Sequence, residues 1–149
     1  MKNEPIFSWN EETGTASCIL GNNEKIYTGF AQCHPDDIDM KGEKTGCEIA
    51  FRRAKIHALR GYRDELKVKL SALNQLFYTM NKSKHFNPKS YENKMLQRQI
   101  RMTNFDLDTA KEMIATEEQN LREYIQKKDE FYNHTRARRK AYIEKANNN

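Results

Sequence analysis

Residues 49–80, IAFRRAKIHALRGYRDELKVKLSALNQLFYTM, carry the pattern that decides the fold. Steps of three and four residues alternate along this stretch for about five heptads, which is the spacing of one inward-facing stripe on a helix. Thr45 and Glu48 stand three residues apart just upstream, as in a capping box, so a first helix is predicted over residues 45–80. The stripe consists of Ile49, Arg52, Ile56, Leu59, Arg63, Leu66, Leu70, Leu73, Phe77 and Met80.

A second helix is predicted over residues 88–143. Residues 81–87 break the first pattern, and Asn87 followed by Pro88 supplies an N-cap with proline at the first helical position. The two helices should form an antiparallel hairpin whose second arm is the longer one. Its uncovered apolar surface predicts a homo-oligomer. The looser second stripe runs through Ile100, Thr103, Leu107, Ala110, Ile114, Glu117, Leu121, Tyr124 and Phe131.

Upstream of the helices, residues 6–33 have the composition of a three-stranded meander. Runs rich in Ile, Phe, Trp, Tyr and Thr alternate with turn-forming clusters of Asn and Gly. Such a sheet has one face to bury and needs the helices against it. The expected fold class is α+β, a small N-terminal antiparallel β-sheet followed by a long antiparallel two-helix hairpin, as a single domain over residues 1–149. The expected strands are 6–9, 15–20 and 25–33.

Composition favours a folded protein with a phosphate-bearing partner. Of the 149 residues, 32% are charged but 10% are aromatic, which argues against a wholly disordered chain. Residues 1–48 carry four Lys or Arg against nine Asp or Glu, whereas residues 49–149 carry twenty-two against twelve. The basic helical part suits nucleic acid, nucleotides or a membrane surface. No signal-peptide core or membrane-spanning run is present, and three cysteines suggest free thiols, so we expect a cytoplasmic protein without a membrane partner.

Catalytic and metal-binding motifs are not apparent. The sequence has no Gly-rich phosphate loop, nucleophile elbow or His-Glu-x-x-His, and its four histidines are scattered. We therefore expect no enzyme activity and no cofactor. A metal site could be imagined from Cys33, His34, Asp36, Asp37 and Cys47, but paired Cys-x-x-Cys ligands are missing and a turn at 35–37 is the preferred interpretation.

Arginines at stripe positions and on the second helix are the most informative charges. Arg52 and Arg63 cannot remain unpaired in an apolar stripe, so each needs an acidic or a phosphate partner. Pairing with a neighbouring Glu48, Asp64 or Glu65 is favoured about two to one on spacing. Arg98 and Arg101 lie one turn apart and could fork a phosphate, or form a solvated face.

The cluster Arg136-Ala-Arg-Arg-Lys140 gives the chain its most nucleic-acid-like element. A basic cluster suffices for sequence-independent phosphate binding. It lacks interleaved aromatics for base stacking, and charge runs of this kind are usually solvated. A coiled-coil protein that binds nucleic acid or a structural partner through its basic hairpin is therefore the alternative function, and nucleic acid is not the expected partner.

Several stretches of the chain carry a family resemblance: residues 27–37 (YTGFAQCHPDD), 43–46 (EKTG), 50–55 (AFRRAK), 78–80 (YTM) and 87–93 (NPKSYEN). Together they resemble proteins of phages and prophages of Gram-positive bacteria, and the pattern is similar to that of the phage anti-Thoeris sponge family. The resemblance covers most of residues 6–130. The basic tail after Phe131 lies outside it.

The resemblance implies a phage counter-defence protein of the host bacterial cytosol. Such a sponge sequesters the cyclic ADP-ribose signal of TIR-domain defence enzymes without degrading it, which blocks Thoeris immunity. It implies a sheet and two long helices in a homo-oligomer, a dimer or a hexamer, with the ligand enclosed between protomers. The ligand would be a glycocyclic ADP-ribose isomer, and other cyclic nucleotides remain open.

A cyclic ADP-ribose isomer offers a pyrophosphate, an adenine face and ribose hydroxyls. Its pocket therefore needs arginine, an aromatic ring and amide or carboxylate acceptors. We assign these roles by residue type and by position in the resembling stretches. The candidates are Arg53 or Arg52, Arg98 and Arg101 for phosphate, Phe77 or Phe86 for the base, and Asn93 or Asp37 for a hydroxyl.

Overall fold

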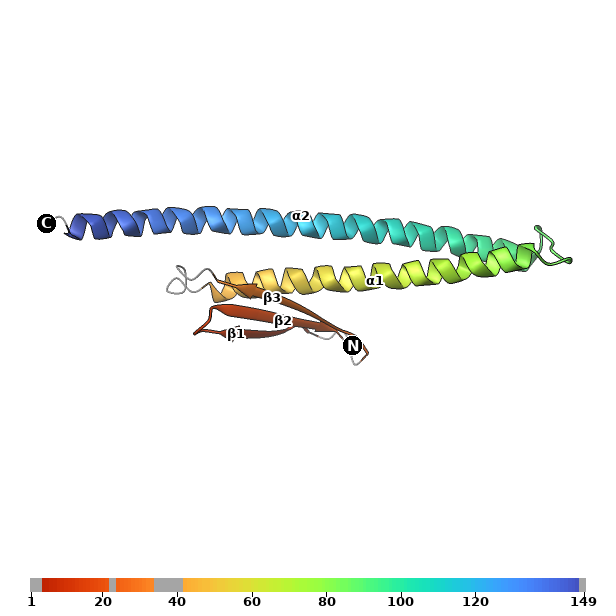
Figure 1. Ribbon diagram of the computed structural model, residues 1–149, viewed down its shortest axis with the longest axis horizontal. Coiled ribbons are helices and arrows are strands. Elements are labelled where there is room, and N and C mark those ends of the chain that lie inside the picture. The colour runs from red at the N-terminus through yellow and green to blue at the C-terminus, as the bar shows by residue number, and fades with distance from the viewer. Residues whose placement is uncertain (1–3, 22–23, 34–41, 148–149) are drawn as a thin grey trace. The chain divides into compact units, whose positions relative to one another are not determined.

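The structure is a computed structural model that describes residues 4–21, 24–33 and 42–147. A three-stranded antiparallel sheet precedes two long helices (Figure 1), which confirms the predicted α+β fold. The elements are β1 (Ile6–Asn10), β2 (Thr15–Gly21), β3 (Ile26–Gln32), α1 (Glu43–Asn81) and α2 (Tyr91–Asn147). All three strands and both helices were predicted within a few residues of these bounds.

The sheet has β2 at its centre, with β1 and β3 as antiparallel neighbours. The Asn10 side chain closes the first turn, since its Oδ1 accepts hydrogen bonds from the backbone N–H groups of Glu12 and Thr13. Gly14 completes the turn at a φ of 64°, a conformation that favours glycine. The register then pairs Trp9 with Ala16 and, across β2, Ala16 with Ala31.

The helices begin at residues other than those predicted. In α1 the Gly46 N–H donates to the Gly42 carbonyl at 2.6 Å, so the helix starts at Glu43 and Thr45 lies inside its first turn. In α2 the Ser90 hydroxyl accepts from the Asn93 N–H at 3.2 Å and caps a helix that starts at Tyr91. Asn87 instead accepts from the Lys89 N–H in the preceding turn.

The chain divides into two compact units that split both helices. Unit 1 comprises Met1–Lys55 and Glu117–Asn149, and unit 2 comprises Ile56–Thr116. The expectation of a single domain stays a prediction.

Small residues form the core of unit 1, where one face of the sheet meets α1. Gly29 in β3 is buried, and a Cβ added there would collide with the carbonyl oxygen of Ala50 in α1. The backbones of strand and helix therefore approach more closely than any side chain would permit. The buried core consists of Ala16, Cys18, Ala31, Ala50 and Ala54.

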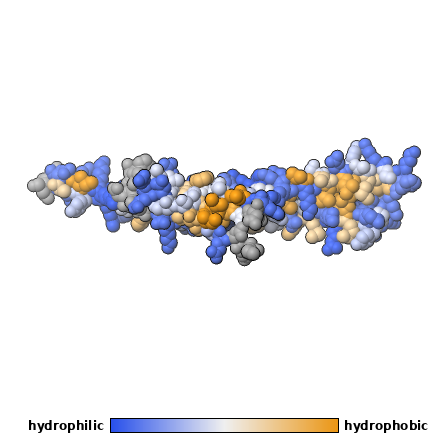
Figure 2. Space-filling view, turned by 90° about the horizontal axis from the view of Figure 1, so that it is seen from below, coloured by the Kyte–Doolittle hydropathy of each residue, from blue (hydrophilic) through white to orange (hydrophobic). Residues whose placement is uncertain are grey.

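The other face of the sheet is open and partly apolar. Alternation along the strands places Ile6, Ile19 and Phe30 opposite the core residues, and their exposed fractions are 66%, 40% and 57%. Figure 2 shows apolar residues gathered over this part of the molecule. The sheet thus presents apolar side chains to the outside as well as to α1.

Unit 2 is built from the stripes that the sequence predicts. Leu66 and Leu70 of α1 pack with Leu107 and Ala110 of α2. Every stripe residue of α1 is buried or half-buried, and the α2 stripe is likewise covered as far as Tyr124.

The prediction that Phe131 belongs to the inward-facing stripe of α2 is wrong. This part of α2 lies in unit 1. Phe131 is 63% exposed, whereas its neighbour Tyr132 is half-buried. A strict seven-residue repeat drifts by about 20° per heptad on a straight helix, so the inward position shifts toward the next residue.

Candidate functional site

Asn93 is the most buried polar side chain of unit 2. It is 1% exposed, and its Nδ2 donates to the Asn87 carbonyl at 2.9 Å, which ties the first turn of α2 to the preceding loop. Its Oδ1 accepts no hydrogen bond from any other described residue. Because buried acceptors are normally paired, this oxygen requires a donor from water or from a ligand hydroxyl.

The two aromatic candidates, Phe77 and Phe86, are half-buried in unit 2. Phe77 is near the end of α1. Phe86 lies in the loop between α1 and α2, where its backbone N–H donates to the Ser83 carbonyl at 3.1 Å. A half-buried ring is held by its surroundings and still has surface for a ligand. Both side chains can therefore serve as stacking partners for a base.

Arg98 and Arg101 are exposed on α2, three residues apart and so on the same side of the helix. Neither forms an ion pair or hydrogen bond with any residue in the described part of the chain. Other cations of unit 2 do have acidic partners: Lys67 lies 3.4 Å from Asp64, and Lys111 lies 2.9 Å from Asp108. The two guanidinium groups are thus available for an external anion.

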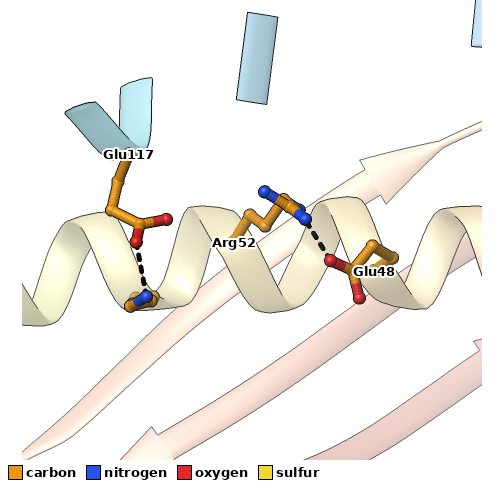
Figure 3. A network of polar contacts seen from close by, with 4 residues as sticks. Glu48, Arg52 and Glu117 are labelled. Carbon is orange, nitrogen blue, oxygen red and sulfur yellow. Dashed lines mark hydrogen bonds and ion pairs between the residues drawn. The ribbon is translucent and has the colours of Figure 1, made fainter. Parts of the chain in front are cut away.

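Arg52 has partners inside unit 1. Its Nε donates to Oε1 of Glu48 at 2.6 Å (Figure 3), and its guanidinium lies 5.1 Å from the centre of the Tyr124 ring. Lys55, three residues further along α1, pairs with Glu117 at 2.5 Å. Arg52 therefore satisfies its charge within the protein, which is the alternative that spacing favoured.

Two further arginines also have internal partners. Arg63 contacts Asp64 at 2.9 Å, and this hydrogen bond holds the pKa of the Asp64 carboxyl below its usual value, with Lys67 adding to the effect. Arg53 is exposed and donates to the Phe30 carbonyl at the outer edge of β3. That bond occupies a backbone acceptor that an edge strand would otherwise leave open.

The eight predicted ligand residues are thus divided by the fold. Unit 2 holds Phe77, Phe86, Asn93, Arg98 and Arg101, and unit 1 holds Arg52 and Arg53. Asp37 lies outside the described residues, as do His34 and Asp36 of the metal site that was considered.

Sequence reasoning missed a cavity in unit 1, which we call the Trp9 pocket. Its lining includes Trp9, Tyr132, Gly42 and Gly46. The sequence does contain a hint of this pocket, because Gly42 and Gly46 are spaced as on one side of a helix and Trp9 is the one tryptophan of the chain. This hint could not be interpreted because the helix was expected to start at residue 45.

The three cysteines carry free thiols. Burial raises the pKa of Cys18 above its ordinary value, and the nearby Cys47 acts in the same direction. Burial also raises the pKa of Cys47, with Glu43 adding to the effect. Both thiols therefore stay protonated near neutral pH and behave as small packing groups.

The C-terminal basic cluster lies in the part of α2 that belongs to unit 1. Arg138 and Arg139 border an open hollow together with Tyr142 and Ile143. Tyr142 is 76% exposed, so one aromatic ring does accompany these charges.

We expect Asn93→Ala to lower the free energy of unfolding by about 1–3 kcal/mol, because the substitution deletes the donor to the Asn87 carbonyl and leaves space at a buried position. Urea titration followed by circular dichroism measures the change. Asn104→Ala is the control, since the Asn104 amide also donates to a backbone carbonyl of α2 but is exposed. Equal losses for the two variants would contradict a structural role for Asn93.

Other findings bear on the class of protein. Within residues 4–21, 24–33 and 42–147, no three His, Cys, Asp or Glu side chains gather as metal ligands would. None of the described helices combines the length and apolar character of a membrane span. No protein-family model, curated protein or solved structure matches the chain.

Proposed function

We propose that the protein binds and sequesters a cyclic ADP-ribose-type nucleotide without degrading it, and so acts as a phage counter-defence protein against Thoeris immunity. The observation that carries this proposal is the exposed pair Arg98 and Arg101, whose guanidinium groups have no partner among the described residues. Two arginines on one side of a helix can each donate charge-assisted hydrogen bonds to a pyrophosphate.

Other groups of unit 2 suit the rest of such a ligand. The unpaired Oδ1 of Asn93 can accept from a ribose hydroxyl, which would satisfy an otherwise orphaned buried acceptor. The half-buried rings of Phe77 and Phe86 offer apolar surface to adenine. One unit thus carries side chains for phosphate, sugar and base.

The same proposal includes a homo-oligomer, either a dimer or a hexamer. Arg98 and Arg101 are open to solvent, and a ligand held only by exposed groups would stay largely hydrated and bind weakly. A second protomer packed over the ligand would supply that enclosure. The exposed apolar residues Phe105 and Met102, close to Arg101 in sequence, are available for such packing.

Isothermal titration calorimetry with the glycocyclic ADP-ribose isomers and cyclic ADP-ribose tests this function. We expect saturable binding by at least one isomer, well below millimolar dissociation constants. Mass spectrometry of the ligand recovered after heat denaturation should show the unchanged mass. Disappearance of the mass peak of the intact ligand would identify a hydrolase instead. An absence of binding up to millimolar concentration would refute the proposal.

A further inference from the structure

The Trp9 pocket in unit 1 is a cavity of about 230 Å³ with aromatic and aliphatic walls. Trp9 from β1 and Tyr132 from α2 both line it, and both are half-buried. Ile49 of α1 and Ile125 of α2 add aliphatic surface. Strands β1 and β3 and both helices thus border an apolar space that the described residues leave unfilled.

Glycines keep this space open. A Cβ on Gly42 would lie 2.5 Å from the Tyr132 hydroxyl oxygen, and a Cβ on Gly46 would lie 3.1 Å from the Trp9 ring. Gly14, at a φ of 64°, also borders the cavity. Side chains at these positions would displace the two aromatic residues, so the pocket depends on their absence.

Polar groups at the wall have unused hydrogen-bonding capacity. Gln32, Thr45 and Asp129 form no side-chain hydrogen bond or ion pair with any other described residue, and all three line the cavity. Lys128 also lines it and lies 5.5 Å from the centre of the Tyr124 ring. Among the described residues of the lining, one cation and one carboxylate cancel and there is no arginine, so together these residues carry no net charge.

Size and charge together define the ligand. Pockets for drug-sized molecules are typically about 300–1,000 Å³, so this one suits a smaller molecule. Aromatic walls favour a planar ring. The Gln32 amide can both donate and accept hydrogen bonds, and the Asp129 carboxylate can accept them. Together they match the edge of a nitrogen heterocycle that carries an amino group. A lining of this kind disfavours phosphate, because the Asp129 carboxylate offsets its one cation, Lys128.

We infer that the Trp9 pocket binds an uncharged purine base or nucleoside, with the ring against Trp9 and Tyr132 and its polar edge at Gln32 and Asp129. This site shares no residue with the phosphate site proposed at Arg98 and Arg101. It therefore stands or falls separately from the proposed function.

Trp9 provides a direct probe, since it is the only tryptophan of the chain. Adenosine and guanosine should change its fluorescence saturably, and adenosine monophosphate should bind no more tightly than adenosine. No saturable change with either nucleoside up to millimolar concentration would overturn the inference. Binding by the monophosphate alone would also overturn it, because the pocket would then be an anion site.

Paired variants test the location. Tyr132→Leu should weaken adenosine binding about tenfold, the loss expected for one stacking contact, whereas Tyr142→Leu, the same change at an exposed position of α2, should leave it unchanged. Asp129→Asn, at an exposed position, should weaken adenosine but not inosine, which lacks the amino group. Circular dichroism establishes that each variant is folded. If Tyr132→Leu fails to fold, Asp129→Asn decides, and an equal change in the affinities for adenosine and inosine relative to the unsubstituted protein refutes the assignment.

Discussion

Gly29→Ala should lower the free energy of unfolding of unit 1 by about 3 kcal/mol or more. The added methyl group would overlap the carbonyl oxygen of Ala50 and approach the backbone nitrogen of Ala54. Backbone atoms of a helix cannot swing aside as a flexible side chain does, so β3 and α1 must separate. Separation exposes the small residues between them and leaves voids that no neighbour can fill.

Guanidinium chloride titration, followed by far-ultraviolet circular dichroism and Trp9 fluorescence, measures this loss. Gly61→Ala is the matched control, because Gly61 lies in the interior of α1 and alanine there should stabilise the helix by about 0.5–1 kcal/mol. Opposite signs for the same chemical change would locate the effect at the contact between sheet and helix. A neutral Gly29→Ala would show that this contact is not tight.

The helices were predictable because their stripes repeat over many turns. Eight apolar positions of α1 agree on one face, and the two exceptions, Arg52 and Arg63, cannot shift it. The strands were predictable because turn-forming residues punctuate them, with Asn10 and Gly14 at the first turn. Both signals are local, so one sequence is enough to find them.

Contacts between elements were not predictable in the same way. Gly29 reads as an ordinary glycine of a strand until the backbone of Ala50 is placed against it. The Trp9 pocket combines residues from β1, α1 and the far part of α2, and no spacing in the sequence links Trp9 to Tyr132. The start of α2 was wrongly predicted for a related reason, since Asn87 and Ser90 both have side chains that can cap a helix and only the backbone decides which one does so.

The sequence shows which residue types could bind the ligand, but not which of these side chains are left without a partner inside the protein. Arg52 and Arg98 are the same residue type on long helices, and both were proposed to bind phosphate. In the structure Arg52 pairs with Glu48 and lies against Tyr124, whereas Arg98 has no partner within the described residues. The difference arises from burial, because a half-buried guanidinium must find an internal acceptor and an exposed one need not.

That difference leads to the second large effect, on ligand binding. The double substitution Arg98→Ala and Arg101→Ala should weaken binding of the preferred cyclic ADP-ribose isomer by at least about 100-fold, since each charge-assisted hydrogen bond contributes about 1.5–3 kcal/mol. The free energy of unfolding should change little, because both side chains are exposed and make no contact with an acidic residue in the described segments. Calorimetry and urea titration on the same preparation measure the two quantities.

A loss of this size must be distinguished from the loss of two positive charges. Lys67→Ala with Lys111→Ala removes the same charge from the same unit, at exposed positions whose lysines lie beside Asp64 and Asp108. Long-range attraction alone would weaken binding equally in both double variants and would vanish at high salt. Direct contact with phosphate predicts that only the arginine variant loses binding and that the difference persists at 0.5 M salt. Equal affinities for the two double variants would place the ligand elsewhere on the protein.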